Sequence, residues 1–304
     1  MAYIWQIIKT ARVTHWAKNL ALFAPLVFSG NLFVPELFFK TFWAMIIFSF
    51  ATSACYLFND VADRQQDRQH PIKKRRPVAS GNLPVHLALF SSAVLGASSL
   101  FAASFLSFFL FVAILAYILL QLFYTLILKT IPIVDILSIS GGFILRIWAG
   151  AFVANIHPSV WFLLCVISVA LFLATGKRKA EVAIIQSFNV KKRSLYSPIL
   201  SDAYLAMFAT SSWISWALFT FFEPSPQVGS YLPFFTDLPL TLAGIGKWLM
   251  ISIPVVIFGI MRYLYIVYSR TWAAETPERT LIKDTPLLLS VILWAGLVFL
   301  ILYS

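Results

Sequence analysis

The chain has 304 residues, of which 60% are hydrophobic and only 12% are charged. Soluble domains carry about 25% charged residues, so this composition excludes an ordinary soluble protein and indicates a chain embedded in a lipid bilayer. The formal net charge is +11. We ascribe it to membrane orientation and to binding of anionic lipids and phosphorylated substrates, rather than to binding of nucleic acid.

Nine apolar segments are long enough to span a bilayer. In chain order they lie at about 13–30, 37–60, 84–104, 106–127, 132–155, 159–177, 202–222, 241–267 and 285–303. The first is the least apolar, since it contains Lys18, Asn19 and Pro25. The sequence therefore predicts an all-α membrane protein with nine transmembrane helices, in which residues 1–304 form a single transmembrane domain.

The basic residues predict the orientation of these spans. If the N-terminus is cytoplasmic, all of the 23 lysines and arginines except Lys40, Arg146 and Lys247 fall in cytoplasmic segments. Because cytoplasmic loops carry the excess of basic residues, we expect a cytoplasmic N-terminus in a bacterial-type inner (plasma) membrane. Most of the long loops lie on that face, so we expect the active site there as well.

The strongest local motif lies at the predicted end of the second span. Asp60, Asp63 and Asp67 are spaced i, i+3 and i+7, so they share one helix face with Asn59 if the helix continues past the membrane. Carboxylates stacked in this way repel one another and are disfavoured at a helix C-terminus. Mg²⁺ removes that conflict, and it typically binds one or two carboxylates together with phosphate oxygens. A solvated acidic helix end paired with nearby arginines is the alternative.

Two further segments contain candidates for binding phosphate. Residues 73–76 are four consecutive basic residues, and Arg76 is followed by Pro77. They could clamp an anion that the metal also binds, or they could serve only as a cytoplasmic anchor. Lys18 and Asn19 enter an apolar run, where polar groups are costly and usually functional.

Ionisable residues also occur in and beside the fifth span. Tyr124 and Lys129 precede it, and Asp135 and Arg146 lie within it, about three turns apart and so on a similar face. Ionisable groups inside a span are candidates for a functional site, with a structural ion pair as the alternative.

The sixth span ends in Lys177-Arg178-Lys179-Ala180-Glu181. The helix dipole favours cations at a C-terminus, which suffices to explain one of them, such as Lys179. Lys177 and Arg178 are candidates for binding phosphate.

These motifs together resemble the UbiA superfamily of intramembrane prenyltransferases. The resemblance rests on Asn59-Asp60-x-x-Asp63-x-x-x-Asp67 and on Arg76-Pro77-x-x-Ser80-Gly81, and it extends over nearly the whole chain. It implies a bundle of nine transmembrane helices around a central cavity that opens to the cytoplasm. It also implies that Mg²⁺ and a diphosphate bind at the Asp-rich motif.

One segment differs from the usual pattern of that superfamily. Aromatic prenyltransferases carry a second Asp-rich motif after the sixth span, where this chain has Lys177-Arg178-Lys179-x-Glu181. The chain is instead similar to the decaprenyl-phosphate phosphoribosyltransferase branch. The stretches that carry this similarity include Trp16-x-Lys18-Asn19, Pro132-x-Val134-Asp135, Gly142-Phe143-x-Leu145-Arg146 and Lys283-Asp284-x-Pro286.

That branch implies a pentosyltransferase of cell-envelope biosynthesis. It would move 5-phosphoribose from phosphoribosyl diphosphate to a decaprenyl-type polyprenyl phosphate and release diphosphate. The resemblance makes Asp60, Asp63 and Asp67 catalytic and, with Asn59, ligands of Mg²⁺. The residues implied in substrate binding are Lys18, Asn19, Arg76, Tyr124, Lys129, Asp135, Arg146, Lys177, Arg178 and Glu181.

Two other functions compete with this interpretation. A prenyltransferase acting on an aromatic acceptor would keep the fold, but the missing second Asp motif argues against it. A transporter or flippase of a phosphorylated lipid should carry charges near the midplane, whereas here almost all charge is predicted at one face. A homo-oligomer is compatible with the sequence.

Overall fold

The computed structural model describes residues 2–69, 73–187, 195–223, 248–269, 280–281 and 283–303. These described residues are mostly helical and include no strand, which confirms the all-α prediction. Eight helical segments among them are long and apolar enough to cross a membrane. They are α3 (Pro35–Ala62), α6 (Val85–Leu106), α7 (Phe108–Leu126), α8 (Val134–Ala154), α9 (Val160–Ser187), α10 (Pro198–Phe222), the segment Trp248–Ser269 that contains η4 (Trp248–Ser252) and α12 (Ile253–Ser269), and α14 (Thr285–Tyr303).

The first expected span, 13–30, is not one of these eight segments. After α1 (Ala2–Ala11) the chain forms a 3₁₀ helix, η1 (Val13–Phe23), followed by the short helix α2 (Ala24–Phe28). A 3₁₀ helix of more than three or four residues is uncommon, so tertiary contacts must hold this segment. The count of nine spans and the cytoplasmic N-terminus remain predictions.

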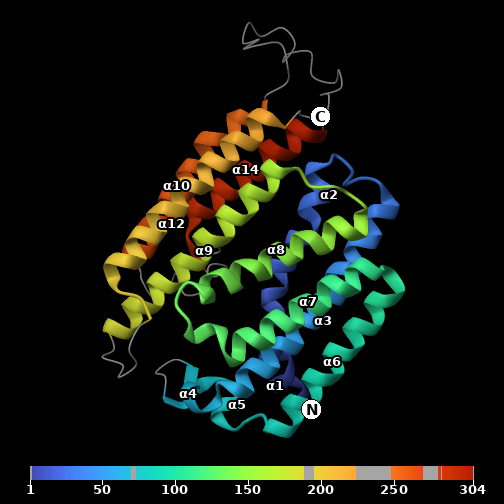
Figure 1. The fold of residues 1–304 in the computed structure, drawn as a ribbon, viewed down its shortest axis with the longest axis vertical. Helices are drawn as coiled ribbons and strands as arrows, with labels where there is room; N and C mark the ends of the chain where they lie inside the picture. The colour runs from blue at the N-terminus through green and yellow to red at the C-terminus, as the bar shows by residue number, and fades with distance from the viewer. Residues whose placement is uncertain are drawn as a thin grey trace, which may run out of the picture. The chain divides into compact units, whose positions relative to one another are not determined.

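The chain divides into two compact units, Met1–His157 and Pro158–Ser304. In the first unit α3 packs against α6, α7 and α8, and η1 lies against α3 and α8 (Figure 1). In the second unit α9 packs against α10, and α12 packs against α10 and α14. The expectation of a single domain remains a prediction.

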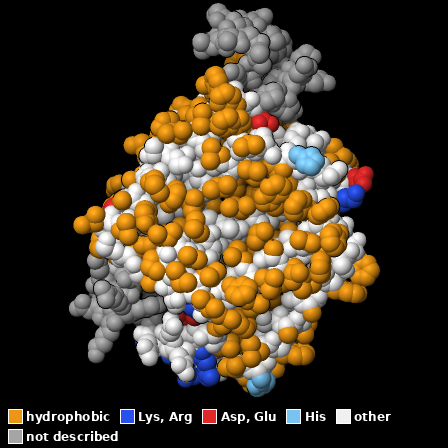
Figure 2. All heavy atoms as spheres, viewed as in Figure 1, with side chains coloured by type: hydrophobic (Ala, Val, Ile, Leu, Met, Phe, Trp, Pro, Cys, Tyr) orange, Lys and Arg blue, Asp and Glu red, His pale blue; other side chains and the backbone are white. Residues whose placement is uncertain are grey.

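Apolar side chains cover much of the outer surface of these helices. Phe105 and Phe108 are 77% and 70% exposed, and Figure 2 shows hydrophobic side chains over most of the described surface in that view. Basic side chains gather instead near the end of the first unit that holds α4 (Arg64–Gln69) and α5 (Pro77–Ser80). Soluble monomers rarely expose apolar patches this extensive, so the surface is that of an integral membrane protein.

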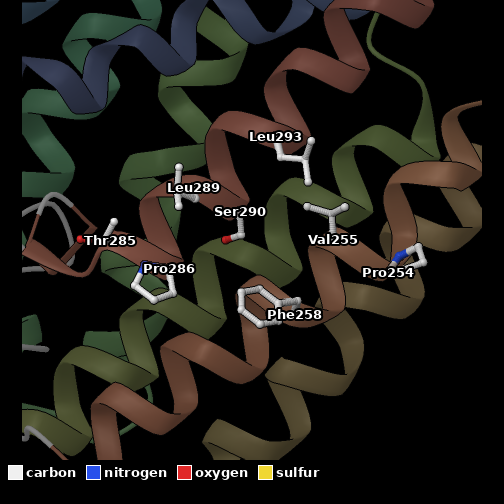
Figure 3. Close-up of a pocket in the computed structure, with 8 residues that line it drawn as sticks. All are labelled: Pro254, Val255, Phe258, Thr285, Pro286, Leu289, Ser290 and Leu293. Carbon is white, nitrogen blue, oxygen red and sulfur yellow. The ribbon is translucent and has the colours of Figure 1, made fainter.

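An apolar groove of about 520 Å³ lies between α12 and α14 in the second unit. Figure 3 shows its walls, which are formed by Pro254, Val255 and Phe258 of α12 and by residues that include Pro286, Leu289 and Leu293 of α14. Its lining is almost entirely hydrocarbon, so it suits a lipid chain better than a polar ligand.

Gly150 of α8 lets η1 pack directly on that helix. A Cβ atom at Gly150 would lie 1.9 Å from the carbonyl oxygen of Leu22 and 2.9 Å from its Cα. Because these are backbone atoms, rotation of a side chain cannot relieve the overlap. The close approach therefore sets the position of η1 against α8.

We expect Gly150→Ala to displace η1 and to lower the free energy of unfolding by about 1–3 kcal/mol, as overpacking typically does. Thermal unfolding in detergent measures the effect. Gly296→Ala in α14 is the matched control, since nothing lies within 4 Å of the added Cβ. Equal unfolding midpoints for both variants and the wild type would contradict the proposed close packing.

Candidate functional site

The acidic motif lies where α3 ends and α4 begins. A shared helix face for the three aspartates required the helix to continue past the membrane, but α3 ends at Ala62 and Asp63 caps it with φ −86° and ψ 1°. The break is slight. The N–H of Asp63 donates to the carbonyl of Asn59 at 2.9 Å, and that of Asp67 donates to the carbonyl of Asp63 at 2.9 Å.

Two of the three carboxylates meet a single guanidinium. Arg76 Nη1 donates to Asp67 Oδ2 at 2.8 Å and to Asp60 Oδ1 at 3.2 Å. Asp60 Oδ1 also accepts from Arg12 Nη2 at 2.6 Å. Asp60 and Asp67 are only 2% and 4% exposed, and a buried carboxylate is costly unless it is paired. Arg12 and Arg76 therefore stabilise this buried acidic pair.

The backbone around Arg76 explains how its side chain reaches both acids. The residue before a proline is disfavoured in the helical region, and Arg76 accordingly has φ −65° and ψ 142° ahead of Pro77. The short helix α5 follows and ends at Gly81 with φ 89°. Arg68 Nε of α4 donates to the carbonyl of Ala79 at 3.0 Å, which holds α4 against α5.

The third aspartate makes a different contact. Asp63 forms an ion pair with Lys129 of the 3₁₀ turn η3 (Leu128–Thr130). Next to it, the side-chain oxygen of Asn59 accepts from Thr125 Oγ1 of α7 at 3.1 Å. These two contacts connect the acidic motif to the segment between α7 and α8, and they place the predicted site residue Lys129 beside it.

In the part of the chain that the structure describes, no three Asp, Glu, His or Cys side chains come together as a metal site. The three aspartates are balanced by basic side chains instead. The carboxylate oxygens of the three aspartates are nevertheless hard ligands. Those of Asp60 and Asp67 already converge on the guanidinium of Arg76. Mg²⁺ usually binds one or two carboxylates and completes its coordination with phosphate oxygens and water. The donor set therefore fits a metal-diphosphate complex better than a metal held by protein alone.

Burial raises the pKa of the Asp67 carboxyl above its ordinary value, and the positive charge of Arg76 opposes that effect. A divalent cation beside this carboxylate would act in the same direction as Arg76. Binding of Mg²⁺ by Asn59 and all three aspartates remains a prediction.

A second, fully buried network joins Asn19 and Arg146. Asn19 Oδ1 accepts from Arg146 Nε at 2.8 Å, and the amide of Asn19 donates to Ser49 Oγ at 2.9 Å. Arg146 Nη2 donates to the hydroxyl of Tyr117 at 3.0 Å, and Nη1 donates to the carbonyl of Gly142 at 2.7 Å. The network ties η1, α3, α7 and α8 together.

Arg146 has no carboxylate partner among the described residues, and aromatic rings surround its charge. Its Cζ lies 5.0 Å from the ring centroid of Tyr117, 5.2 Å from that of Phe143 and 5.6 Å from that of Phe48. The cation is thus stabilised by neutral acceptors and π-systems. We expected Asn19 and Arg146 to bind substrate; that role remains a prediction, while their contacts show a structural one.

The other predicted site residues of the first unit differ in solvent exposure. Asp135 is completely buried in the first turn of α8, whereas Lys18 and Tyr124 are half-buried. Their binding of substrate remains a prediction.

The second unit holds the basic residues at the end of α9. Arg178 forms an ion pair with Glu181 one turn later, and Lys177 is half-buried beside it. Lys179 Nζ lies 2.6 Å from Asp202 Oδ1 of α10, and it also lies over the ring of Tyr268 of α12. Lys179 therefore links α9 to α10 and α12, which is a structural role. A phosphate-binding role for Lys177 and Arg178 remains a prediction.

Sequence reasoning singled out neither Arg12 nor Arg262 as a member of an ion pair. Arg12 and Asp60 are 48 positions apart, so no local spacing predicts their contact. Arg262 of α12 forms two hydrogen bonds of 2.9 Å with Asp284, which also accepts from the N–H of Leu287 at the start of α14. The sequence offered a partial signal for the second pair, since Asp284 stands three residues before an apolar run, where helix caps occur.

We expect the Asn19–Arg146 contact to show as an interaction energy in a double-mutant cycle. Asn19→Ala and Arg146→Met should each lower the free energy of unfolding by about 1–3 kcal/mol, because each leaves buried polar groups unpaired. The double variant should lose less than the sum, with a difference of about 0.5–3 kcal/mol. Arg146→Met and Lys40→Ala should lower the free energy of unfolding additively, because the exposed Lys40 shares no contact with Arg146. Additivity in the first cycle would contradict the network.

Comparison with known proteins places this geometry in context. Residues 20–274 match the UbiA prenyltransferase family. The decaprenyl-phosphate phosphoribosyltransferase of Corynebacterium glutamicum is 34% identical over 98% of this chain and 86% of its own length. That of Mycolicibacterium smegmatis is 31% identical over 95% of this chain and 90% of its own. The structure of a UbiA homologue from Archaeoglobus fulgidus bound to GPP and Mg²⁺ has the same fold, with a TM-score of 0.69, 17% identity, and coverage of 98% of this chain and 100% of that one.

Proposed function

The chain belongs to the UbiA prenyltransferase family, and from this premise we propose that it transfers 5-phosphoribose from phosphoribosyl diphosphate to a decaprenyl-type polyprenyl phosphate, releasing diphosphate. The observation that carries the proposal is the similarity, over nearly the whole chain, to relatives named decaprenyl-phosphate phosphoribosyltransferase. The basic end of α9, at a place where aromatic prenyltransferases have an Asp-rich motif, supports a donor richer in phosphate than a prenyl diphosphate.

The acidic motif of the first unit is suited to the diphosphate of the donor. Asp60 and Asp67, together with Asp63 and Asn59, would hold Mg²⁺. When bound, the ion neutralises the charge that develops on the leaving diphosphate as C1 gains oxocarbenium character. Arg76 already contacts both buried acids, and its planar guanidinium can donate to phosphate oxygens from the same position.

The remaining basic residues would bind the other phosphate groups. Lys129, beside Asp63, would contact an oxygen of the donor, and Lys18 and Arg146 would bind further phosphate oxygens. Lys177 and Arg178 would bind the 5-phosphate or the acceptor phosphate, with Glu181 or Asp135 accepting from ribose hydroxyls. The acceptor phosphate is ionised at neutral pH, so the transfer requires no general base.

The apolar surfaces suit the acceptor and the location. The groove between α12 and α14 offers an isoprenoid chain an almost entirely apolar wall, in which the hydroxyl of Ser290 already donates to the carbonyl of Leu287 (Figure 3). We assign the protein to a bacterial-type inner membrane as a single domain of nine spans, with the active site facing the cytoplasm. Assembly into a homo-oligomer is compatible with this arrangement.

A two-donor assay tests the proposed reaction. Membranes or purified protein should transfer label from phosphoribosyl diphosphate to polyprenyl phosphate, and EDTA should abolish the transfer because the leaving group then lacks its metal. Labelled prenyl diphosphate with an aromatic acceptor serves as the comparison. Transfer only from the prenyl donor would overturn the proposal in favour of an aromatic prenyltransferase.

Replacing one oxygen ligand tests the role of the acidic motif. Asp60→Asn should lower kcat/KM roughly 100-fold or more, because it removes a charged ligand of the metal while keeping the shape of the side chain. Glu36→Gln, at the opposite end of α3 and paired with Lys40 on the surface, is the control and should remain active. A folded Asp60→Asn protein with the wild-type rate and wild-type metal requirement would rule out the assignment.

A further inference from the structure

We propose that Arg12 is the counter-ion of Asp60 in the free protein and moves onto the diphosphate when the donor binds. The divalent cation then enters the site together with a diphosphate rather than ahead of it. This inference rests on the proposed function, since it concerns the same acidic motif. It assigns a role to a residue that the motif alone does not include.

The contact of Arg12 with Asp60 joins a partly exposed cation to a buried anion. Nη2 of Arg12 lies 2.6 Å from Oδ1 of Asp60, and the side chains are 21% and 2% exposed. The guanidinium also stacks on the ring of Tyr56, with Cζ 4.7 Å from the ring centroid. The side chain of Arg12 is thus partly accessible to an arriving anion, as is that of Arg76, which is 26% exposed.

The backbone shows that this placement is imposed by the surroundings. Arg12 has φ 52° and ψ 52°, the left-handed conformation, which is uncommon for residues other than glycine. The neighbouring carbonyl of Ala11 accepts from Ser53 Oγ at 3.1 Å, and the carbonyl of Arg12 accepts from the N–H of His15 at 2.7 Å. A strained conformation persists only when its surroundings hold it, and such positions concentrate at functional sites.

The charges of the cluster determine the order of binding. Arg12 and Arg76 carry two positive charges and Asp60 and Asp67 carry two negative ones, so the cluster is neutral. A divalent cation entering alone would bring a double positive charge next to two guanidinium groups. A diphosphate entering with it removes that excess and offers the arginines new acceptors.

Arg12 is better suited than Arg76 to make this exchange. Arg76 is held by both acids, and its shorter contact is to Asp67, at 2.8 Å against 3.2 Å to Asp60. Arg12 pairs with Asp60 alone among the described carboxylates. Moving Arg12 therefore breaks one ion pair and removes the nearer of the two donors on Asp60 Oδ1, while Arg76 keeps its shorter contact with Asp67.

Binding of Mn²⁺ to the full chain in detergent or nanodiscs tests the inference, because Mn²⁺ takes the same oxygen ligands as Mg²⁺ and is detected by electron paramagnetic resonance. Without diphosphate, Arg12→Ala should bind Mn²⁺ at least about fivefold more tightly than the wild type, the lower end of typical coupling between sites. Inorganic diphosphate should then raise the affinity for Mn²⁺ less in Arg12→Ala than in the wild type. If the role of Arg12 were only structural, its removal would not both tighten the binding of Mn²⁺ without diphosphate and reduce the effect of diphosphate on that binding.

Matched variants complete the experiment. Arg12→Lys keeps the charge and should resemble the wild type, and Lys9→Ala removes an exposed charge from α1 and should do the same. Arg12→Gln repeats the test if the alanine variant does not fold. Unchanged or weaker binding of Mn²⁺ by the uncharged Arg12 variants without diphosphate would overturn the inference. Because the probe contains no ribose or prenyl group, the result stands apart from that of the two-donor assay.

Discussion

Burial of Asp60 and Asp67 is the constraint on which the first unit depends. Removing two carboxylates from water costs several kcal/mol each unless cations accompany them. Arg12, which precedes the acidic motif in the sequence, and Arg76, which follows it, supply these cations. The end of α1, the junction of α3 with α4 and the start of α5 must therefore converge, and the same convergence creates the candidate site.

The position of η1 follows from hydrogen bonds of its own uncharged side chains and from close backbone packing. Trp16 Nε1 donates to Ser53 Oγ at 3.0 Å, Asn19 bonds to Ser49 and Arg146, and the backbone at Leu22 lies directly on Gly150. Small and hydroxyl-bearing residues of α3 and α8 allow this approach and supply hydrogen-bond partners where no water reaches. A long 3₁₀ helix, unfavourable by itself, is held in this way and presents Arg12 to Asp60.

The two units supply different kinds of chemistry. The first carries hard oxygen ligands that basic residues balance, and the second carries a cationic helix end in which Arg178 is paired with Glu181. A divalent cation matches the diphosphate, and guanidinium and ammonium groups match the remaining phosphate oxygens.

The sequence by itself determined the helical class, eight of the membrane-crossing segments and the residues of the acidic motif, because hydropathy and helical spacing are properties of neighbouring positions. It did not determine the break after Ala62, the 3₁₀ form of η1 or the partners of Asp60 and Asn19. Those depend on side chains brought together from distant positions, and burial decides which of them must pair. Only the tertiary structure could show that Arg12 balances Asp60. It also shows that Arg146, which pairs with no carboxylate of the described residues, is held by an amide, a phenol and aromatic rings.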